Sequence, residues 1–284
     1  ALEHKTKKHD IQAGLTYRIE NITEDSKEYE MRDSSGYSIP HTGEDLYMIY
    51  SLKAKNTLDA NRLETYIQDT WRFSSKGEHT FFTLNYGIRF SHWNFNKESI
   101  ISPRISLGIV PAFNHDVTMG FATGIYYQAP FYKELRDTTT INGITYATLN
   151  NKIKSQRSIH FIAGFDYRFK MKDRPYKFTA EAYYKALSNL VPYTVDNVKI
   201  VYDASQQCSG HAMGLDLKLY GEFVPGTDSW VSLSLMNTRI NINGKSIPLP
   251  TDQRYSLNLF FTDYFPGTDR WRMSLKLAFA DGLP

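Results

Sequence analysis

The sequence predicts an all-β protein, forming the wall of a transmembrane antiparallel up-and-down β-barrel with short turns at one end and long loops at the other. Three observations predict this fold class. Apolar and polar residues alternate with a period of two, which places them on opposite faces of extended strands. Tyr contributes 20 residues and Phe 17, and aromatic side chains favour strands. The connections between the alternating stretches are short at one end and mostly long at the other.

The alternation is clearest in the stretch RSIHFIAGFDYRFK, which begins at Arg157. Phe161, Ala163 and Phe165 point to one face, while His160, Gly164 and Asp166 point to the other. Similar patterns recur along the chain, and no stretch shows a sustained helical period. We expect about eleven strands, at residues 9–21, 62–74, 80–94, 100–112, 116–128, 157–170, 176–188, 209–223, 229–241, 253–264 and 270–280.

The connections distinguish the two ends of these strands. Five of them, SSKGEH, AFNHD, KMKDRP, VPGTDS and FPGTDR, are short and rich in the residues that tight turns require. Residues 22–61, 129–156, 189–208 and 242–252 are expected to be polar insertions at the other end, where only 95–99 is brief. Outer-membrane barrels have short periplasmic turns and long extracellular loops.

Two of the short turns form a near repeat, PGTDSW from Pro225 and PGTDRW from Pro266. Trp230 and Trp271 then follow the turns at equivalent positions, and Trp71 lies near another short turn. Indole rings at such depths anchor barrels at the membrane interface, so we expect these three residues to be interface anchors. For any one of them alone, a place in the core of a soluble sandwich would be the simpler reading.

Composition and motifs exclude several classes of function. The net charge is +3 with basic and acidic residues interleaved, which gives no support for nucleic-acid binding. Cys208 is the single cysteine, and the histidines form no HExxH pair, so we expect no metal site, no cofactor and no enzyme activity. The mean hydropathy is −0.45 and no apolar run is long enough for a transmembrane helix, whereas a barrel strand needs an apolar residue only at every second position.

The strand count bears on closure. If the short turns are periplasmic, the first and the eleventh strand both run outward, and an odd number of strands cannot close an antiparallel barrel. We therefore expect residues 1–284 to form one partial transmembrane barrel, with the closing strand lying outside them.

A family resemblance supports this interpretation. The strings ETYIQDTWRF, SPRISLGIVPAF, ATGIYYQAPFYKELRD, RPYKFTAEAYYKALSNLVPY, GLDLKLYGEFVPGTDSWVSLSL, PLPTDQRYSLNLFFTDYFPG and LAFADGLP resemble the C-terminal barrel region of TonB-dependent receptors of the Bacteroidota type. The resemblance covers roughly residues 60–284 and consists of strand and turn patterns. It implies a barrel of about 22 strands, of which this chain is the C-terminal half, without the family's N-terminal plug domain.

The resemblance also implies a function: active import of an extracellular nutrient across the outer membrane of a Gram-negative bacterium, driven by TonB. The implied partners are TonB, the protein's own plug, outer-membrane lipid and, as a candidate, a surface lipoprotein. Two alternatives remain: a passive porin-like or structural barrel, and a soluble β-sandwich or propeller that binds glycans.

Candidate site residues fall into two sets. The polar face of the strands is expected to line the lumen and to hold the plug, through Arg18, Arg89, Arg104, Asp166, Arg168, Glu181, Lys185, Asp216 and Lys218. The long loops carry Tyr132, Tyr146, Tyr193 and Tyr202 beside polar groups, and such tyrosines can stack on sugars or flat ligands. The competing interpretation is that these tyrosines pack the loops on one another.

Overall fold

The computed structural model describes residues 2–32, 47–75, 77, 79–196, 199–268 and 270–282. In this part of the chain, twelve strands follow one another along a single antiparallel sheet. They are β1 (Leu2–Lys5), β2 (His9–Arg32), β3 (Tyr47–Ser74), β4 (Phe81–Trp93), β5 (Glu98–Val110), β6 (Val117–Gln128), β9 (Gln156–Met171), β10 (Arg174–Leu190), β13 (Cys208–Val224), β14 (Thr227–Ile242), β16 (Tyr255–Tyr264) and β17 (Arg272–Ala280).

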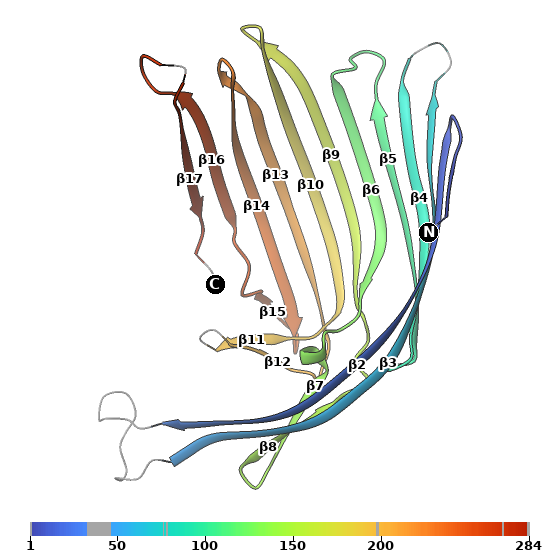
Figure 1. Cartoon of the computed structure of the whole chain (residues 1–284), viewed down its shortest axis with the longest axis vertical. Coiled ribbons are helices and arrows are strands. Elements are labelled where there is room, and N and C mark those ends of the chain that lie inside the picture. Colours follow the sequence, from blue (N-terminus) through green and yellow to red (C-terminus); the bar gives the residue numbers. More distant parts are fainter. Residues whose placement is uncertain are drawn as a thin grey trace.

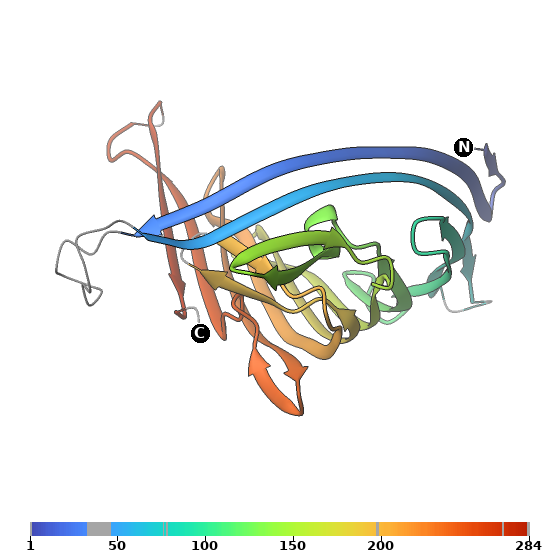
Figure 2. The same ribbon diagram turned by 90° about the horizontal axis from the view of Figure 1, so that it is seen from below.

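This sheet is an up-and-down wall whose two ends differ (Figure 1). Short turns join the strands at the upper edge of the view, which we call the short-turn end. At the opposite, long-loop end lie the extended hairpin of β2 and β3 and the smaller elements η1 (Tyr132–Leu135), β7 (Arg136–Ile141), β8 (Ile144–Leu149), β11 (Tyr193–Asp196), β12 (Lys199–Tyr202) and β15 (Lys245–Pro248). Seen from below, the wall curves around η1 and the β7–β8 and β11–β12 hairpins, which lie on its concave side (Figure 2).

The eleven predicted strands are confirmed, and nine of them agree with the structure within two residues at both ends. The short strand β1 was not predicted; it pairs with the start of β2, with Leu2 opposite Ala13. The sheet path begins at β1 and ends at β17, and these two strands are not paired with each other.

The expectation of a polar loop insertion at residues 22–61 is wrong for residues 22–32 and 47–61, and residues 33–46 lie outside the described part of the chain. β2 and β3 continue their pairing well past the predicted strand ends, with Glu24 opposite Asn56 and Glu28 opposite Leu52. On β3 the apolar residues here occupy the other face: Leu52, Ala54, Leu58 and Ala60 are buried on the side that carries Arg62 and Glu64 further along. The alternation therefore continues, but before Arg62 the even-numbered residues of β3 are the apolar ones. A pattern that follows the odd-numbered positions finds polar residues here and predicts a loop.

One face of the wall is apolar and uncovered. Leu15 is 68% exposed, Phe161 54% and Leu275 51%, and many large apolar side chains on the same face are similarly exposed. Apolar area of this extent is stable only against a lipid or protein environment. No helix in the described ranges is long and apolar enough to cross a membrane.

One carboxylate on this apolar face has hydrogen-bond partners for one of its two oxygens, while Asp69 Oδ1 is buried without one. Asp69 is 8% exposed, and its Oδ2 atom accepts a hydrogen bond from Tyr86 Oη at 2.9 Å and lies 2.7 Å from His9 Nδ1. The His9 ring in turn stacks on Trp71, with 5.7 Å between ring centroids. These contacts explain how a carboxylate is tolerated there, since burying a polar group without a partner costs several kcal/mol, roughly 2–7.

Three glycines of the strands face tyrosine rings directly across the ladder. Gly14 is opposite Tyr66, Gly214 opposite Tyr183, and Gly221 opposite Tyr176. A Cβ atom built on Gly214 would lie 2.5 Å from Tyr183 Oη and 2.6 Å from the Leu235 carbonyl oxygen. The ring occupies the space that a side chain would take, so glycine is required at this position.

We predict that Gly214→Ala destabilises the barrel by about 1–3 kcal/mol, because the added methyl group displaces the Tyr183 ring or the β14 backbone. Gly120→Ala is the matched control, since a Cβ there meets no atom within 4 Å. The measurement is a urea titration of the folded, heat-modifiable band on gels. Equal midpoints for the two variants would show that the ring contact does not constrain the strand.

Candidate functional site

The concave face of the wall is polar, and the strand register places all nine predicted lumen residues on it. Arg18 is opposite Arg62, which is opposite Trp93, and Trp93 packs against the loops on the concave side. Residues directly opposite each other on neighbouring strands share a face, and so do residues two apart on one strand, so all nine residues can be assigned to the face of Trp93. The linking pairs are Arg89 with Ser102, Arg104 with Gly124, Gly124 with His160, His160 with Lys185, Glu181 with Asp216, and Lys218 with Ser232.

Cations on this face lie over aromatic rings. Arg104 Cζ is 4.4 Å from the centroid of the Tyr126 ring. The Tyr126 ring also stacks on the His160 ring, with 4.2 Å between their centroids. Lys185 and Lys218 lie 5.0 and 5.2 Å from the rings of Tyr183 and Trp230. Such contacts orient a cation without neutralising it, so these side chains remain available to an anionic or polar partner.

Other charges of the face are paired. Asp166 accepts from Lys177 at 2.9 Å, and Glu20 lies 3.3 Å from Arg62 and 3.9 Å from Arg18. The wall therefore combines neutralised ion pairs with cation-aromatic contacts on one face.

A depression of about 540 Å³ lies on the concave face between β3 and β6. Its lining includes Tyr66, Gln68, Arg89, Arg104 and Tyr126, so donors from five side chains converge on one hollow. Ala122 also lines it and presents only a methyl group to the hollow. The arrangement can bind a polar or anionic group. In the described ranges, no group of three or more His, Cys, Asp or Glu residues could hold a metal ion.

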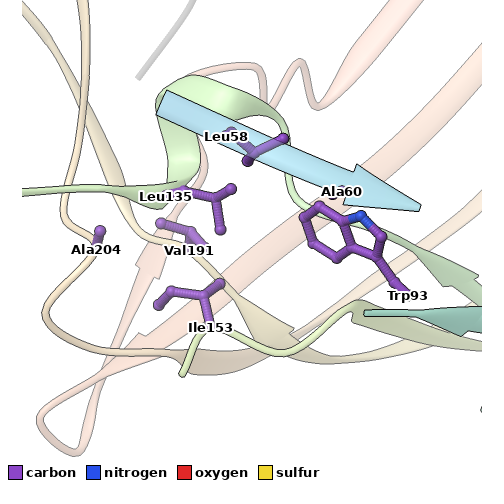
Figure 3. Packing of buried hydrophobic residues seen from close by; sticks show 7 residues of the cluster. All are labelled: Leu58, Ala60, Trp93, Leu135, Ile153, Val191 and Ala204. Atoms are coloured by element: carbon purple, nitrogen blue, oxygen red, sulfur yellow. The ribbon is translucent and has the colours of Figure 1, made fainter. Parts of the chain in front are cut away.

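On the concave side of the wall, at its long-loop end, the loops form a small hydrophobic core of their own (Figure 3). Leu58 and Trp93 from the wall pack against Leu135, Ile153 and Val191 from the loops. Tyr132 and Tyr202 are partly buried against the same core. The concave face thus changes from polar to apolar where this loop cluster, residues 129–155, 189–196 and 199–207, covers it.

Glu24 joins the β2–β3 hairpin to the loop cluster. Its carboxylate accepts hydrogen bonds from Tyr132 Oη at 2.7 Å and Asn56 Nδ2 at 3.0 Å, and Arg136 Nε lies 3.4 Å away. Burial and the hydrogen bond to Glu24 raise the pKa of Tyr132 to about 12. Alongside, β3 pairs in parallel with β8, with Ala54 opposite Ala147.

Side-chain amides connect the two loop segments. Gln207 Nε2 donates to the carbonyl oxygens of Lys154 and Asn189, both at 2.9 Å, and Asn150 Nδ2 donates to that of Ala204 at 2.9 Å. Such bonds satisfy loop carbonyls that no strand pairs.

Comparison with known proteins identifies the wall. Residues 3–282 match the family described as TonB dependent receptor-like, beta-barrel. The chain belongs to this family. Search of the curated proteins gave no match.

Solved barrels of the family have the same fold. The outer membrane transporter YddB from Escherichia coli aligns with a TM-score of 0.56 at 15% identity, covering 91% of this chain and 38% of that one. The ferric enterobactin receptor PfeA aligns with a TM-score of 0.55 at 15% identity, covering 95% and 42%. This TonB-dependent receptor barrel therefore spans about two fifths of the length of these two chains, and at such identity the likeness shows the fold alone.

Of the three predicted interface anchors, the structure contradicts one. Trp71 and Trp271 share the face of the apolar residues, and Trp271 is 72% exposed. Trp230 is opposite Tyr220 on the concave face, where it stacks on Phe260 and lies under Lys218. The prediction that Trp230 lies against lipid is wrong. Trp230 comes one residue before Val231 and three before Leu233, so its side chain points to the face opposite these apolar residues. The similarity of the two turns suggested that Trp230 and Trp271 lie on the same face.

The four loop tyrosines differ in their surroundings. Tyr132 is held by Glu24, and Tyr202 packs on the loop core with its ring 5.8 Å from that of Tyr193. Tyr146 on β8 is 39% exposed. The structure thus does not bring the four together around one space, and their role in ligand binding stays a prediction.

The sequence analysis missed the carboxylates that organise the loops. Besides Glu24, Glu134 is 5% exposed, and its two oxygens accept hydrogen bonds from the Phe131 amide and from Gln156 Nε2, both at 2.8 Å. Burial raises the pKa of Glu134 above its ordinary value, and the two hydrogen bonds offset only part of this effect. The reversed alternation of Leu52, Ala54, Leu58 and Ala60 is the signal that could have located this cluster.

We predict that Glu134→Ala lowers the opening free energy of the loop cluster by about 1–3 kcal/mol, because the partly buried Phe131 amide and Gln156 Nε2 both lose a charged acceptor. Glu134→Gln keeps one acceptor and removes the charge. Since the folded-state pKa of Glu134 is raised, the wild-type cluster loses stability as pH rises from the ordinary Glu pKa through the raised one, and the Gln variant should lack this dependence.

Hydrogen exchange of the Phe131 amide between pH 4 and 7 measures both effects, after correction for the intrinsic exchange rate. Asp25→Ala, which removes an exposed carboxylate of the β2–β3 hairpin, is the control. Unchanged protection in Glu134→Ala would contradict the assigned role.

Proposed function

We propose that this chain forms wall and extracellular loops of an active transporter in the outer membrane of a Gram-negative bacterium, importing a nutrient with energy from TonB. The family match over residues 3–282 carries the proposal. Under it, the short-turn end is periplasmic and the long-loop end extracellular. The Bacteroidota type stays a prediction.

The proposal assigns the concave face to contacts with a plug domain. Plug domains and cargo present backbone and polar groups, and the cations held over rings by Tyr126, Tyr183 and Trp230 are suited to them. Residues 1–284 then form part of a larger barrel, whose remaining strands adjoin β1 and β17. Further partners are TonB, outer-membrane lipid and a surface lipoprotein at the loops.

Ligand capture falls to the loops in this scheme. Tyr146 is exposed, whereas the other three candidate tyrosines are half-buried. Tyr132 already donates a hydrogen bond to Glu24. A flat or sugar ligand stacking on Tyr146 and Tyr193 would meet rings anchored by the loop cluster.

The proposal predicts that import requires the TonB system. A growth screen on limiting nutrients should find a substrate that the wild type uses and a strain lacking this protein does not. Removing TonB, or dissipating the proton gradient, should reduce uptake of that substrate to the level of the deletion strain. Uptake that persists without TonB would identify a passive porin and overturn the proposal.

A further inference from the structure

The outward, apolar face of the wall carries a groove. It has a volume of about 610 Å³ and crosses β5, β6, β9 and β10. Its floor is formed by Ala163 and Ala182, which are directly opposite each other on β9 and β10. Phe121, Phe161 and Tyr184 stand around these alanines as its walls.

The groove follows from side-chain size in the strand register. Ala163 is opposite Phe121 on one side and Ala182 on the other, so two methyl groups lie beside a ring. One pair nearer the long-loop end, Phe161 is opposite Tyr184. An acyl chain lying in this void would contact the two methyl groups and the rings on either side of them.

Basic side chains lie on the same face, closer to the long-loop end. Arg239 on β14 is opposite His211 on β13, which is opposite Ala186 on β10. Arg157 on β9 is exposed and donates from Nε to Ser188 Oγ at 2.9 Å. The Ala186 pair lies four residues from Ala182 along β10, which corresponds to roughly 13 Å of strand.

These cations have no acidic partner on their face. Among the described residues, neither Arg157 nor Arg239 is in an ion pair, whereas Arg18, Arg62 and Arg136 are. The outward neighbours of the two arginines carry no carboxylate: Tyr127 and Ser188 lie beside Arg157, and His211 and Pro248 lie beside Arg239. Tyr184 connects the two regions, since its ring stacks on His211 at 6.3 Å and also walls the groove.

We propose that this surface binds a membrane lipid with a phosphate-bearing anionic head group, its phosphate against Arg157, His211 and Arg239 and an acyl chain in the groove at Ala163 and Ala182. Guanidinium forks match phosphate oxygens, and they do so most strongly where water is scarce. Charge complementarity selects an anionic lipid over a zwitterionic one. The proposal rests on the proposed function only in that this face lies in a membrane, with the cations in the leaflet at the long-loop end.

The test uses the full-length protein, purified in mild detergent and reconstituted with lipid A or with phosphatidylethanolamine, followed by native mass spectrometry. Wild type should retain lipid A at least about tenfold better than phosphatidylethanolamine. The double variant Arg157→Gln, Arg239→Gln should lose about tenfold of this preference. Arg270→Gln, which removes the same charge at the short-turn end, should not change it.

The groove is tested separately. Ala163→Leu fills its floor and should lower lipid A retention, whereas Ala13→Leu, on the same apolar face of β2, is the matched control and should leave it unchanged. Heat-modified gel mobility reports folding for each variant, and if the double glutamine variant fails to fold, the Ala163 and Ala13 pair decides.

Equal retention of the two lipids by wild type, or retention in Ala163→Leu equal to that in Ala13→Leu, would overturn the proposal. Failure of the proposed function itself looks different. A protein that is not a transporter but is still a membrane barrel would keep the lipid preference, and a water-soluble protein would retain neither lipid.

Discussion

The antiparallel register of twelve neighbouring strands is the constraint on which the rest of the molecule depends. Because side chains alternate along a strand, a fixed register sends every apolar row to one face and every polar row to the other. A slip of one residue in a single strand would put Arg104 or Lys185 against hydrocarbon. The glycines opposite Tyr66, Tyr176 and Tyr183 reinforce the register, since each ring fits only where its partner lacks a side chain.

The same constraint explains how the wall changes character along its length. Next to the short turns and through the middle, the outward face is apolar and the concave face carries charges over rings. Beyond Arg62 the pattern of β3 reverses, and Leu58 and Ala60 bury themselves under Leu135 and Ile153 of the loops. The loops are thereby fixed by a hydrophobic core and by carboxylates such as Glu24 and Glu134, so they form a folded cap on the concave side.

Strands and faces of the barrel were predictable from sequence because each strand repeats one physical signal many times. The loop cluster was not, since its contacts join residues far apart in the chain, such as Glu24 with Tyr132 and Glu98 with Ser155. The prediction for Trp230 failed for a different reason. It rested on the similarity of two turns, although the apolar residues after Trp230 occupy the alternate positions and therefore the other face. The apolar residues Leu52 and Ala54 could be seen in the sequence, but they occupy the face that is polar in the rest of the strand. A search for apolar residues on the other face alone finds only polar ones there.

Spin labels placed one at a time at residues 158–169 of β9, in the full-length protein in lipid bilayers and with Cys208 replaced by serine, test the two-faced wall most directly. Accessibility to oxygen should alternate with a period of two, with maxima at Ile159, Phe161, Ala163, Phe165 and Tyr167 and minima at His160, Gly164, Asp166 and Arg168. A lack of alternation, or high accessibility of the odd-numbered positions to a polar relaxant, would show that the apolar rows do not face lipid and would contradict the account.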